Sequence, residues 1–462
     1  MASEATSAGS AVDLAPATAS SSFALRDALL DPGSFQPWRS AVGDGVLAGS
    51  GRVDGRPVCI WLQDATERGG SLGALGGETI ARTISRARRA RVPVIGLPQS
   101  AGARLQEGVA ALSAYAAIFR EQARARTCVP QVTLISGACA GGAAYSPALG
   151  DFVVMGGPSA RLFLTGPKVV EQVTREAISA DDLGGSRVHS ANGVAHLVAD
   201  NDRSAVRLLR ELLSYLPSAL GGELPAAAPV PAPSGSPADC VPTERRRVYD
   251  VRDVIAALFD GGSYFELAER WARNLVTTLA RLDGWPVGVI ANQPQHLGGT
   301  IDNAGAEKGA WFVSLCDRLA LPLVVLVDTP GFLPGAAQER AGVIRHGASL
   351  LRAFAQATVP RLTVTLRQAY GGAHIVMNSR DLGSDLTLAW PDAQIGIMGA
   401  SQAVAITEHR AIAAGADAAA LADNYAQTKL AVGAAATDGF VDEVVSPDAT
   451  RDRLIHALEL HR

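Results

Sequence analysis

The sequence predicts an α/β protein that consists of two tandem domains related by internal duplication. The phrase RVDGRPV, which begins at Arg52, returns as RLDGWPV at Arg281, 229 residues later. A glycine pair at residues 141–142 returns at residues 371–372, at an offset of 230. A repeat of about 200 residues is a whole domain and is too long for the unit of a solenoid. We therefore expect two copies of one fold in a single chain.

Short β-rich runs alternate with helical patterns in both copies. The predicted strands are VPVIGL, VPQVTLISG and DFVVM in the first copy, and LPLVVLVD, VPRLTVTL and DLTLAW in the second. Between them lie runs with helical periodicity, such as GVAALSAYAAIFREQAR and GVIRHGASLLRAFAQA. Strands that alternate with helices across glycine-rich turns are typical of parallel sheets built from ββα or βαβ units.

The duplication and the composition together predict the domain boundaries. Residues 1–22 are rich in Ala and Ser and are expected to form a disordered tail. The first copy is expected over residues 23–225 and the second over residues 245–462. Residues 226–244 are rich in Pro and Ala and lack periodicity, so we expect them to be an interdomain linker.

Charge and composition narrow the classes of partner. The net charge of −4 does not favour a nucleic-acid partner. None of the five cysteines forms a CxxC pair, so we expect reduced thiols in a cytoplasmic protein and no metal site. The first 22 residues lack the basic and apolar regions of a signal peptide, and no run of 18 apolar residues would span a membrane.

Two turns in the first copy indicate a site that stabilises negative charge. A predicted strand ends near Ser136, and Gly141 and Gly142 then precede a helical run. Glycines allow main-chain conformations that are closed to other residues, and N–H groups at a helix N-terminus carry partial positive charge. The turn PQSAGARLQEG, residues 98–108, ends the preceding strand in the same way. Two such turns can together hold one oxyanion.

The second copy repeats these turns. DTPGFLPG matches PQSAGAR in position, QAYGGAH matches ACAGGAA, and IGIMGAS matches LFLTGPK. The chain is therefore expected to contain two oxyanion-type sites. A Gly-Gly pair in a chain with 48 glycines can also serve only the tight packing of a strand against a helix, so this structural interpretation stays open.

Other candidate residues carry less weight. His346 lies on a helical pattern and is expected to be packed or exposed, whereas His374, beside the second glycine pair, is a better candidate for chemistry. Ser136 and Ser146 lack a GxSxG elbow, and the chain has no GxxxxGK[ST] loop. The arginine-rich run over residues 82–91 predicts a solvated helix face, where phosphates of a nucleotide-bearing substrate could also dock.

Longer motifs resemble those of a known family. SGACAGGAAYSPALGDF, residues 136–152, resembles the signature GPCAGGAVYSPAL-DF of biotin-dependent acyl-CoA carboxyltransferases, the β subunits of propionyl-CoA and acetyl-CoA carboxylases. VDTPGFLPG and RQAYGGAH are similar to the family's VDVPGFLPG and RKAYGGAY. The resemblance runs from about Leu25 to Pro447 and so covers most of the chain.

The resemblance implies two crotonase-like domains of the ββα spiral type, the first for acyl-CoA and the second for carboxybiotin. It implies transfer of a carboxyl group from carboxybiotin to the α-carbon of a short acyl-CoA, through an enolate held in a backbone oxyanion hole. None of the three lysines is a plausible biotin carrier, so a separate biotin carboxylase and biotin carrier subunit would supply biotin. The Ala/Ser-rich tail stands where the family has a basic helical region. The resemblance implies an active site between two subunits of a homohexamer, or of a dimer if this shortened N-terminal region blocks the ring.

Carried over by position, the resemblance implies roles for individual residues. Gly141 and Gly142 would act on the thioester, and Gly399 and Ala400 on biotin. The acyl-CoA substrate would contact Ser100, Ala101, Gly102, Ala103, Arg104, Ala140, Tyr145 and Gln402. Biotin would be bound by Gly331, Phe332, Tyr370, Gly371, Gly372 and His374.

Several positions depart from the family pattern. QSAGAR replaces DSGGAR, RQAYGGAHI replaces RKAYGGAYD, and Gln402 stands where glycine is common. These departures keep open a biotin-independent decarboxylase of a malonyl-type thioester or β-keto acid, in which His374 would donate the quenching proton. A third hypothesis is a non-catalytic scaffold subunit, and the intact glycine turns argue against it.

Overall fold

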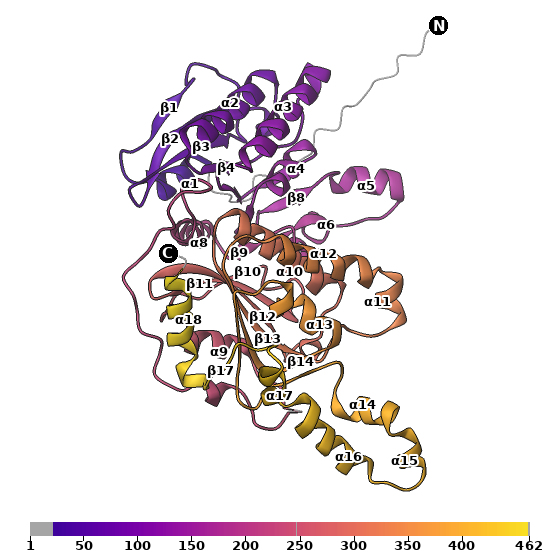
Figure 1. Ribbon diagram of the computed structural model, residues 1–462. Helices are drawn as coiled ribbons and strands as arrows, with labels where there is room; N and C mark the ends of the chain where they lie inside the picture. Colours follow the sequence, from indigo (N-terminus) through magenta and orange to yellow (C-terminus); the bar gives the residue numbers. More distant parts are fainter. Residues whose placement is uncertain (1–21, 246, 461–462) are drawn as a thin grey trace. The chain divides into compact units, whose positions relative to one another are not determined.

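The computed structural model describes residues 22–245 and 247–460, and the chain divides into two compact units (Figure 1). Unit 1 contains the described residues up to Leu213 together with Ser218–Leu220, and unit 2 contains Ser214–Pro217 and the described residues from Gly221 onward. The predicted disordered tail, residues 1–22, lies outside the described residues except for Ser22, the first residue of helix α1.

Unit 1 is built on a seven-stranded sheet with the order β1-β2-β3-β4-β5-β7-β9, in which β1, β2 and β3 are antiparallel and the later strands parallel. The short strands β6 and β8 form a separate parallel pair. The strands are β1 (Gln36–Trp38), β2 (Val46–Val53), β3 (Arg56–Gln63), β4 (Val94–Leu97), β5 (Gln131–Ile135), β6 (Ala138–Ala140), β7 (Phe152–Gly156), β8 (Arg161–Phe163) and β9 (Leu197–Ala199). The α-helices are α1 (Ser22–Leu29), α2 (Ala74–Ala90), α3 (Val109–Ala125), α4 (Gly142–Leu149), α5 (Pro167–Thr174), α6 (Ala180–Gly184), α7 (Ser186–Ala191) and α8 (Asp202–Tyr215), the last of which ends in unit 2.

Unit 2 repeats this plan with the strand order β10-β11-β12-β13-β14-β15-β17, and β16 pairs with the end of β14. The strands are β10 (Phe265–Leu267), β11 (Leu275–Leu282), β12 (Trp285–Asn292), β13 (Leu323–Thr329), β14 (Arg361–Tyr370), β15 (Leu386–Ala389), β16 (Gln394–Gly396) and β17 (Glu443–Val444). The α-helices are α9 (Val251–Leu258), α10 (Asn303–Arg318), α11 (Ala336–Arg340), α12 (Val343–Gln356), α13 (Gly371–Val376), α14 (Ala400–Thr407), α15 (His409–Ala413), α16 (Ala418–Tyr425), α17 (Val432–Thr437) and α18 (Thr450–Glu459). Helices α14 to α16 extend away from the sheet of this unit (Figure 1).

The repeated phrase RxDGxPV is the turn of a β-hairpin in each unit. Asp54 and Gly55 have φ values of 50° and 77°, and Asp283 and Gly284 have values of 54° and 78°. Two consecutive positive φ angles define a type I′ turn, for which Asp-Gly is a favoured pair. The parallel strands also keep one register, because Val94 pairs with Gln131 in unit 1 as Leu323 pairs with Arg361 in unit 2. The predicted α/β class and internal duplication are confirmed.

Each unit has its own apolar core between its sheet and helices that pack on it. In unit 1 the buried cluster includes Trp61 of β3, Ile80 and Ile84 of α2, and Tyr115 and Ile118 of α3. The spacing of four and three residues places these side chains on one face of each helix, where they contact the sheet. In unit 2 a buried cluster is formed mainly by alternating residues of β11 to β14 and by one face each of α9 and α18.

The proline-rich segment predicted as a linker, residues 226–244, runs along the hairpin of unit 2. The N–H of Ala227 donates to the carbonyl of Gly284 at 2.9 Å, and the N–H of Gly261 donates to the carbonyl of Pro231 at 3.2 Å. A short 3₁₀ helix, Pro237–Cys240, follows. These bonds hold the main chain of the segment on unit 2.

No helix within the described ranges is both long and apolar enough to cross a membrane. Across the same residues, no group of three or more His, Cys, Asp and Glu side chains is placed to hold a metal ion. The five cysteines are all free thiols.

Lys308 of α10 is a completely buried lysine whose Nζ donates to the carbonyls of Trp271 and Leu275, at 2.8 and 2.7 Å. Burial lowers the pKa of Lys308 from 10.5 to about 7. Below pH 7 the amine is protonated in both states, so the cost of burying its charge is constant. Between pH 7 and 10.5 only the unfolded chain holds the proton, so stability rises with pH, by at most about 1.4 kcal/mol per unit.

Replacement of Lys308 by methionine is therefore expected to remove a rise in stability between pH 7 and 10. The measurement is the difference in Tm between the wild-type chain and Lys308→Met across that range. The exposed Lys168 supplies the control, since Lys168→Met is expected to leave the pH dependence unchanged. Parallel Tm curves for wild type and Lys308→Met would contradict the expectation.

Candidate functional site

The two glycine-rich turns of unit 1 are joined side by side. The N–H of Ser100, after β4, donates to the carbonyl of Ala138, and the N–H of Ala140 donates to the carbonyl of Ser100, both at 2.9 Å. The Ser100 hydroxyl donates to the carbonyl of Gly70 at 2.8 Å and accepts from the N–H of Gly102 at 3.1 Å. The Ser100 side chain therefore holds the turn that follows it.

Each of these two turns carries a main-chain N–H group that could act as a donor. Leu72 pairs with Ala103 in an isolated parallel bridge. The carbonyl of Leu72 accepts from the N–H of Arg104 at 2.9 Å, and its N–H donates to the carbonyl of Gly102 at 2.8 Å. In this pattern the N–H of Ala103 points away from Leu72. Gly142 is the first residue of α4, and its N–H lies outside the intrahelical hydrogen bonds. We identify Ala103 and Gly142 as the candidate donors of unit 1.

The structural role of Gly141 differs from that of Gly142. Its N–H already donates to the carbonyl of Phe163 at 3.1 Å, so it is not a free donor. Its φ of 61° is the conformation that turns the chain from β6 into α4. A Cβ on Gly141 would lie only 3.9 Å from the Cα of Gly102, which shows how closely the two turns approach.

Arg104 is buried beside the first turn. It is 3% exposed, pairs with Asp44 and with Glu107 at 2.8 Å, and donates to the carbonyl of Ser71 at 2.8 Å. Glu107 also accepts from the N–H of Ala74 at 2.7 Å, and this bond is the first cause of its lowered pKa. The predicted substrate contact of Arg104 is therefore indirect: the side chain ties the turn to the start of α2.

The remaining sequence candidates of unit 1 have clear structural partners. Tyr145 is 52% exposed and packs edge-on against Phe119, with ring centroids 6.2 Å apart. Ser136 accepts from Gln99 at 3.0 Å, and Ser146 donates to Gln122 at 3.1 Å. Both hydroxyls are buried in packing contacts, in agreement with the weak case for a serine nucleophile.

Unit 2 repeats the turn geometry, but the aromatic residue Phe332 stands at the position of Ala103. Gly371 has a φ of 59°, close to that of Gly141, and Ile301 bridges Phe332 as Leu72 bridges Ala103. The Phe332 ring lies 3.1 Å from where a Cβ on Gly347 would be. Around it is an almost wholly apolar cavity of about 410 Å³, lined by Phe332, Val343, Ile344, Gly347, Ala348, Leu351, Gly372, Ile375 and Val376.

A more polar cavity of about 510 Å³ lies at the N-terminus of α14. It is lined by Arg245, Pro330, Gln368, Tyr370, Gln394, Met398, Gly399, Ala400, Ser401, Gln402, Ala422, Asp423 and Ala426, and we call it the α14 cavity. Gly399 precedes the helix with φ −59° and ψ 151°, nearly the values of Gly166 before α5, −66° and 159°. The next residue is proline in unit 1 and Ala400 in unit 2, so only unit 2 offers an N–H at this position.

His374 lines a third cavity, of about 680 Å³, together with Gly371, Gly372, Asp381, Ile397 and Lys429 among others. Burial lowers the pKa of His374, although the nearby Asp381 acts in the opposite direction. The imidazole is therefore neutral near pH 7. His346 is half-buried on α12 and contacts Arg345, as the helical pattern predicts.

The residues expected to bind biotin, except Gly331, are divided among these three cavities of unit 2. The carbonyl of Gly331 accepts from the N–H of Ile301 at 3.1 Å. Gln402, which was expected to contact acyl-CoA, lines the α14 cavity with some of them. Tyr370, Gly399, Ala400 and Gln402 share the α14 cavity, whereas Gly371 and His374 line the third cavity. Sequence reasoning missed Arg245 and Gln394 in the α14 cavity. The hydroxyl of Tyr370 donates to Gln394 at 2.6 Å, a contact between the ends of β14 and β16 that no local motif indicates.

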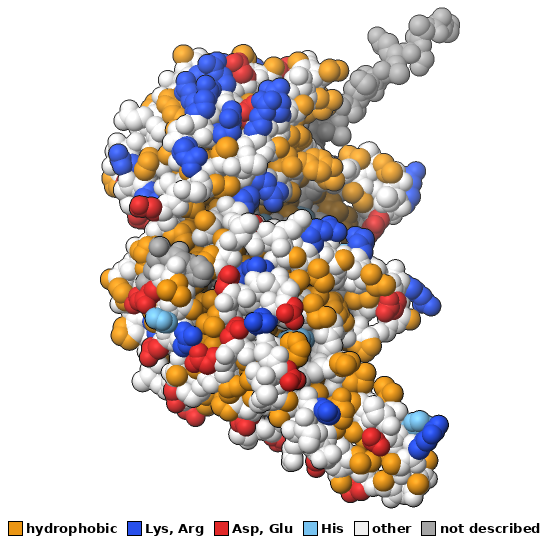
Figure 2. Space-filling model, viewed as in Figure 1, with side chains coloured by type: hydrophobic (Ala, Val, Ile, Leu, Met, Phe, Trp, Pro, Cys, Tyr) orange, Lys and Arg blue, Asp and Glu red, His pale blue; other side chains and the backbone are white. Residues whose placement is uncertain are grey.

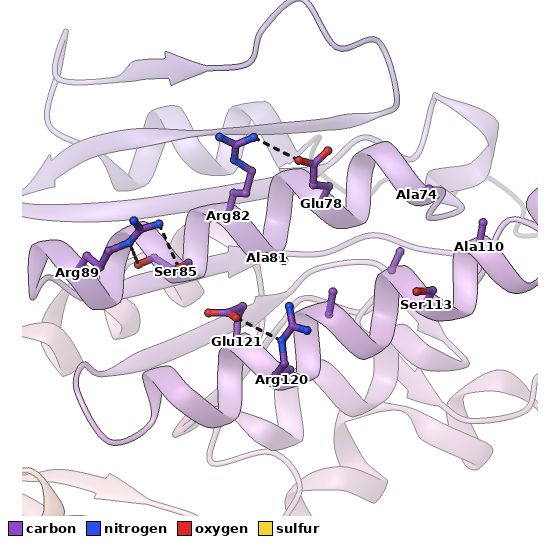
Figure 3. A pocket seen from close by; sticks show the side chains of 12 residues that line it. Ala74, Glu78, Ala81, Arg82, Ser85, Arg89, Ala110, Ser113, Arg120 and Glu121 are labelled. Carbon is purple, nitrogen blue, oxygen red and sulfur yellow. Dashed lines mark hydrogen bonds and ion pairs between the residues drawn. The ribbon is translucent and has the colours of Figure 1, made fainter.

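The arginine-rich run of unit 1 lies on α2, which packs beside α3 (Figure 1). Figure 2 shows basic side chains gathered over this part of unit 1. A groove of about 430 Å³ runs between α2 and α3 and is lined by residues of both helices (Figure 3). Within it, ion pairs join Arg82 to Glu78 at 3.2 Å and Arg120 to Glu121 at 3.4 Å. The predicted solvated face is therefore partly neutralised by its own glutamates.

The geometry defines a class of protein. A duplicated ββα unit with main-chain donors at glycine turns is the architecture of crotonase-type enzymes, which stabilise the oxyanion of a thioester. The family model of the carboxyl transferase domain matches residues 19–462, so the chain belongs to the carboxyl transferase family. The resemblance identified from the motifs is confirmed.

Curated relatives in this family are subunits of acyl-CoA carboxyltransferases. The chain is 44% identical over 438 residues to the propionyl-CoA carboxylase beta chain of Saccharopolyspora erythraea, covering 90% of this chain and 80% of that one. It is 41% identical over 455 residues to the methylmalonyl-CoA carboxyltransferase 12S subunit of Propionibacterium freudenreichii, covering 94% and 87%. These relatives favour an acyl-CoA carboxyltransferase over both the decarboxylase and the scaffold.

Two solved structures of carboxyltransferases and carboxylases also match the fold of this chain. A transcarboxylase 12S structure, described as a hexamer with methylmalonyl-coenzyme A and methylmalonic acid bound, matches with a TM-score of 0.92 and 40% identity. The match covers 96% of this chain and 89% of that one. A single-chain, multi-domain long-chain acyl-CoA carboxylase matches with a TM-score of 0.82 and 30% identity, over 95% of this chain and 46% of that one.

Proposed function

We propose that the chain transfers a carboxyl group between carboxybiotin and the α-carbon of a short acyl-CoA. The observation that carries the proposal is the presence of two different main-chain donor sites in one duplicated chain. Unit 1 has the Ala103 and Gly142 N–H groups, and unit 2 has the N–H groups at the start of α14. Carboxyl transfer needs two such sites, because carboxybiotin and the acyl thioester each carry a carbonyl oxygen that gains negative charge. Membership of the carboxyl transferase family supports this reaction.

In unit 1 the Ala103 and Gly142 N–H groups would hold the thioester oxygen. The α-proton of the acyl group would pass to the biotin nitrogen that has released the carboxyl group, and negative charge would then move onto that oxygen as the enolate forms. Fixed N–H donors stabilise this charge more than the neutral carbonyl, which lowers the barrier to enolate formation. Buried Ser100 and Arg104 would keep the donors in place, and Tyr145 would border the acyl chain from α4.

In unit 2 the residues of the α14 cavity fit the ureido group of biotin. Biotin, when bound, supplies the carboxyl group from a ring nitrogen. The N–H groups of Ala400 and Ser401 at the helix start would bind the ureido oxygen, and the helix dipole favours negative charge there. Tyr370 and Gln394, already joined by a hydrogen bond, would line the ring from the ends of β14 and β16.

The proposal includes a second copy of the chain and a biotin-bearing partner subunit. The two units expose apolar side chains at equivalent positions near their donor sites. Tyr145, Leu164 and Val173 are 52%, 54% and 76% exposed, and their counterparts Ile375, Ile397 and Ile406 are 48%, 77% and 63% exposed. Unit 1 of one copy would cover unit 2 of another through these faces, within a cytoplasmic hexamer like that described for the transcarboxylase 12S structure.

The test is incubation of the purified chain with methylmalonyl-CoA and malonyl-CoA, with and without free biotin, with the acyl products followed by mass. The proposal expects propionyl-CoA and acetyl-CoA to appear only when biotin is present, from a particle several times the mass of one chain. Loss of the carboxyl group at the same rate without biotin would contradict it.

In the proposed assembly, the acyl chain held by unit 1 of one copy would meet the α14 cavity of another copy, so Gln402 is expected to influence the choice of acyl group. Its Oε1 atom lies 2.8 Å from where a Cβ on Gly399 would be, so the side chain folds back over the start of α14 and narrows the α14 cavity. Gln402→Gly removes this cover and is expected to raise kcat/KM for propionyl-CoA relative to acetyl-CoA by about tenfold, the effect of one methylene in a pocket. An equal change for both substrates would show that Gln402 does not act on specificity.

A further inference from the structure

A buried ion-pair network lies under the turn that follows β13. Asp328 is fully buried, and its Oδ2 accepts from the Tyr249 hydroxyl at 2.8 Å and lies 3.0 Å from Arg367 Nε. The Arg367 guanidinium lies 5.2 Å from the centroid of the Tyr249 ring and donates to the carbonyl of Arg247 at 2.7 Å. Three chain segments therefore meet at one carboxylate.

Unit 1 has no such charges at the equivalent positions. The strand registers place Gln99 where unit 2 has Asp328, and Gly137 where unit 2 has Arg367. Gln99 donates to the Ser136 hydroxyl at 3.0 Å, and a Cβ on Gly137 would lie 3.1 Å from Gln99 Cγ. The same fold therefore forms with a neutral contact here, so the fold itself does not require the ion pair of unit 2.

A buried ion pair is a costly way to hold a strand, because both charges lose their hydration. Such a pair is best understood where it fixes one arrangement that apolar packing would leave loose.

Residues close in sequence to each of these three positions line the α14 cavity. Pro330 follows Asp328 by two residues and Gln368 follows Arg367 by one, and both line this cavity. Arg245, also in the lining, donates to the carbonyl of Arg367 at 3.2 Å and to that of Asp392 at 2.6 Å. A shift of Asp328 or Arg367 would therefore move the cavity wall opposite the start of α14.

We infer that Tyr249, Asp328 and Arg367 are positioning residues that fix the wall of the α14 cavity against the N–H donors of α14. The inference rests on the proposed function, since it assigns the network to the biotin side alone. None of the three residues touches the reacting atoms. Their effect is on the rate of transfer once both substrates are bound, and the acyl-CoA site in unit 1 does not depend on them.

Tyr249→Phe tests this with a single lost hydroxyl, because the ring that faces Arg367 is kept. Tyr215→Phe is a matched control: Tyr215 is also buried in unit 2, its hydroxyl donates to the carbonyl of Ser263 at 2.6 Å, and Arg281 lies 4.9 Å from its ring centroid. Tyr215 is outside the lining of the α14 cavity.

The first readout is hydrogen–deuterium exchange of the wild-type and variant chains, without substrates. Tyr249→Phe is expected to speed amide exchange several-fold in peptides covering residues 328–333 and 366–370, and Tyr215→Phe is expected to leave both at the wild-type rate. The second readout is the kinetics of carboxyl transfer to free biotin. Tyr249→Phe is expected to lower kcat about 10- to 100-fold with an unchanged KM for acyl-CoA.

Exchange at the wild-type rate in both peptides would overturn the inference, as would an equal loss of kcat in Tyr215→Phe. Arg367→Lys, which keeps the charge and loses the planar guanidinium, provides a second variant if Tyr249→Phe does not fold, with the same expected pattern. Faster exchange in Tyr249→Phe together with a wild-type chain that transfers no carboxyl group would support the positioning role and contradict the proposed function, so the two failures are distinguishable.

Discussion

Replacement of Ala400 by proline is expected to lower the rate of carboxyl transfer to biotin by about 100- to 1,000-fold, the usual cost of one lost oxyanion donor. Proline at the first helical position is compatible with α14, and Gly399 already has the extended ψ of 151° that a residue before proline requires. Unit 1 already has a proline at this position, because Pro167 begins α5 after Gly166, whose backbone angles are nearly those of Gly399. The variant therefore removes one N–H and leaves the helix.

The measurement is kcat for biotin-dependent transfer beside the dissociation constant of acyl-CoA, which is expected to stay at its wild-type value. Ala418→Pro is the control, because Ala418 is the first residue of α16, follows the N-cap Asp417 and lies outside the lining of the α14 cavity. Wild-type kcat in Ala400→Pro would show that this N–H does not act on the biotin side. Equal losses in both variants would point to helix stability instead.

The second large effect is expected from Gly142→Ala in unit 1. A Cβ on Gly142 would lie 2.9 Å from atoms of the buried Tyr115 ring, closer than real Cβ contacts allow. The start of α4 must then move, and its N–H group moves away from that of Ala103. We expect kcat/KM for acyl-CoA to fall by at least about 100-fold.

Gly43→Ala is the matched control, because no atom lies within 4 Å of the added Cβ and no positive φ is lost. It is expected to keep wild-type kinetics. A Tm of Gly142→Ala close to that of the wild type would separate a local shift of the donor from unfolding. Wild-type kcat/KM in a folded Gly142→Ala chain would exclude Gly142 as a donor to the thioester.

Much of the fold could be predicted from local sequence alone. Asp-Gly in the two RxDGxPV phrases dictates a hairpin turn, and the β-rich runs and helical patterns follow their residue periodicity. The glycine pairs marked the starts of α4 and α13 for the same reason, since a φ near 60° favours glycine. The long motifs around these turns were enough to identify the family, later confirmed over residues 19–462.

The roles within the candidate site could not be assigned in this way. Gly141 and Gly142 are neighbours in one motif, yet only the partner strand β8 commits the N–H of Gly141 to Phe163 and leaves that of Gly142 outside. The motif predicts that Arg104 contacts the substrate, but it does not indicate that the guanidinium pairs with Asp44, 60 residues earlier. Most of the residues predicted for the biotin side line three cavities, two of which share Gly372 and Ile375.

Residue order alone is enough to predict the duplicated α/β fold, the positions of its glycine turns and the carboxyl transferase family. These features depend on backbone preferences and on the spacing of residues along the chain. Tertiary structure alone decided which N–H groups are free, and that Asp328 of β13, Arg367 of β14 and Tyr249 before α9 share one buried network. Hydrogen bonds and ion pairs between segments far apart in sequence depend on how strands and helices pack, and no local pattern records them.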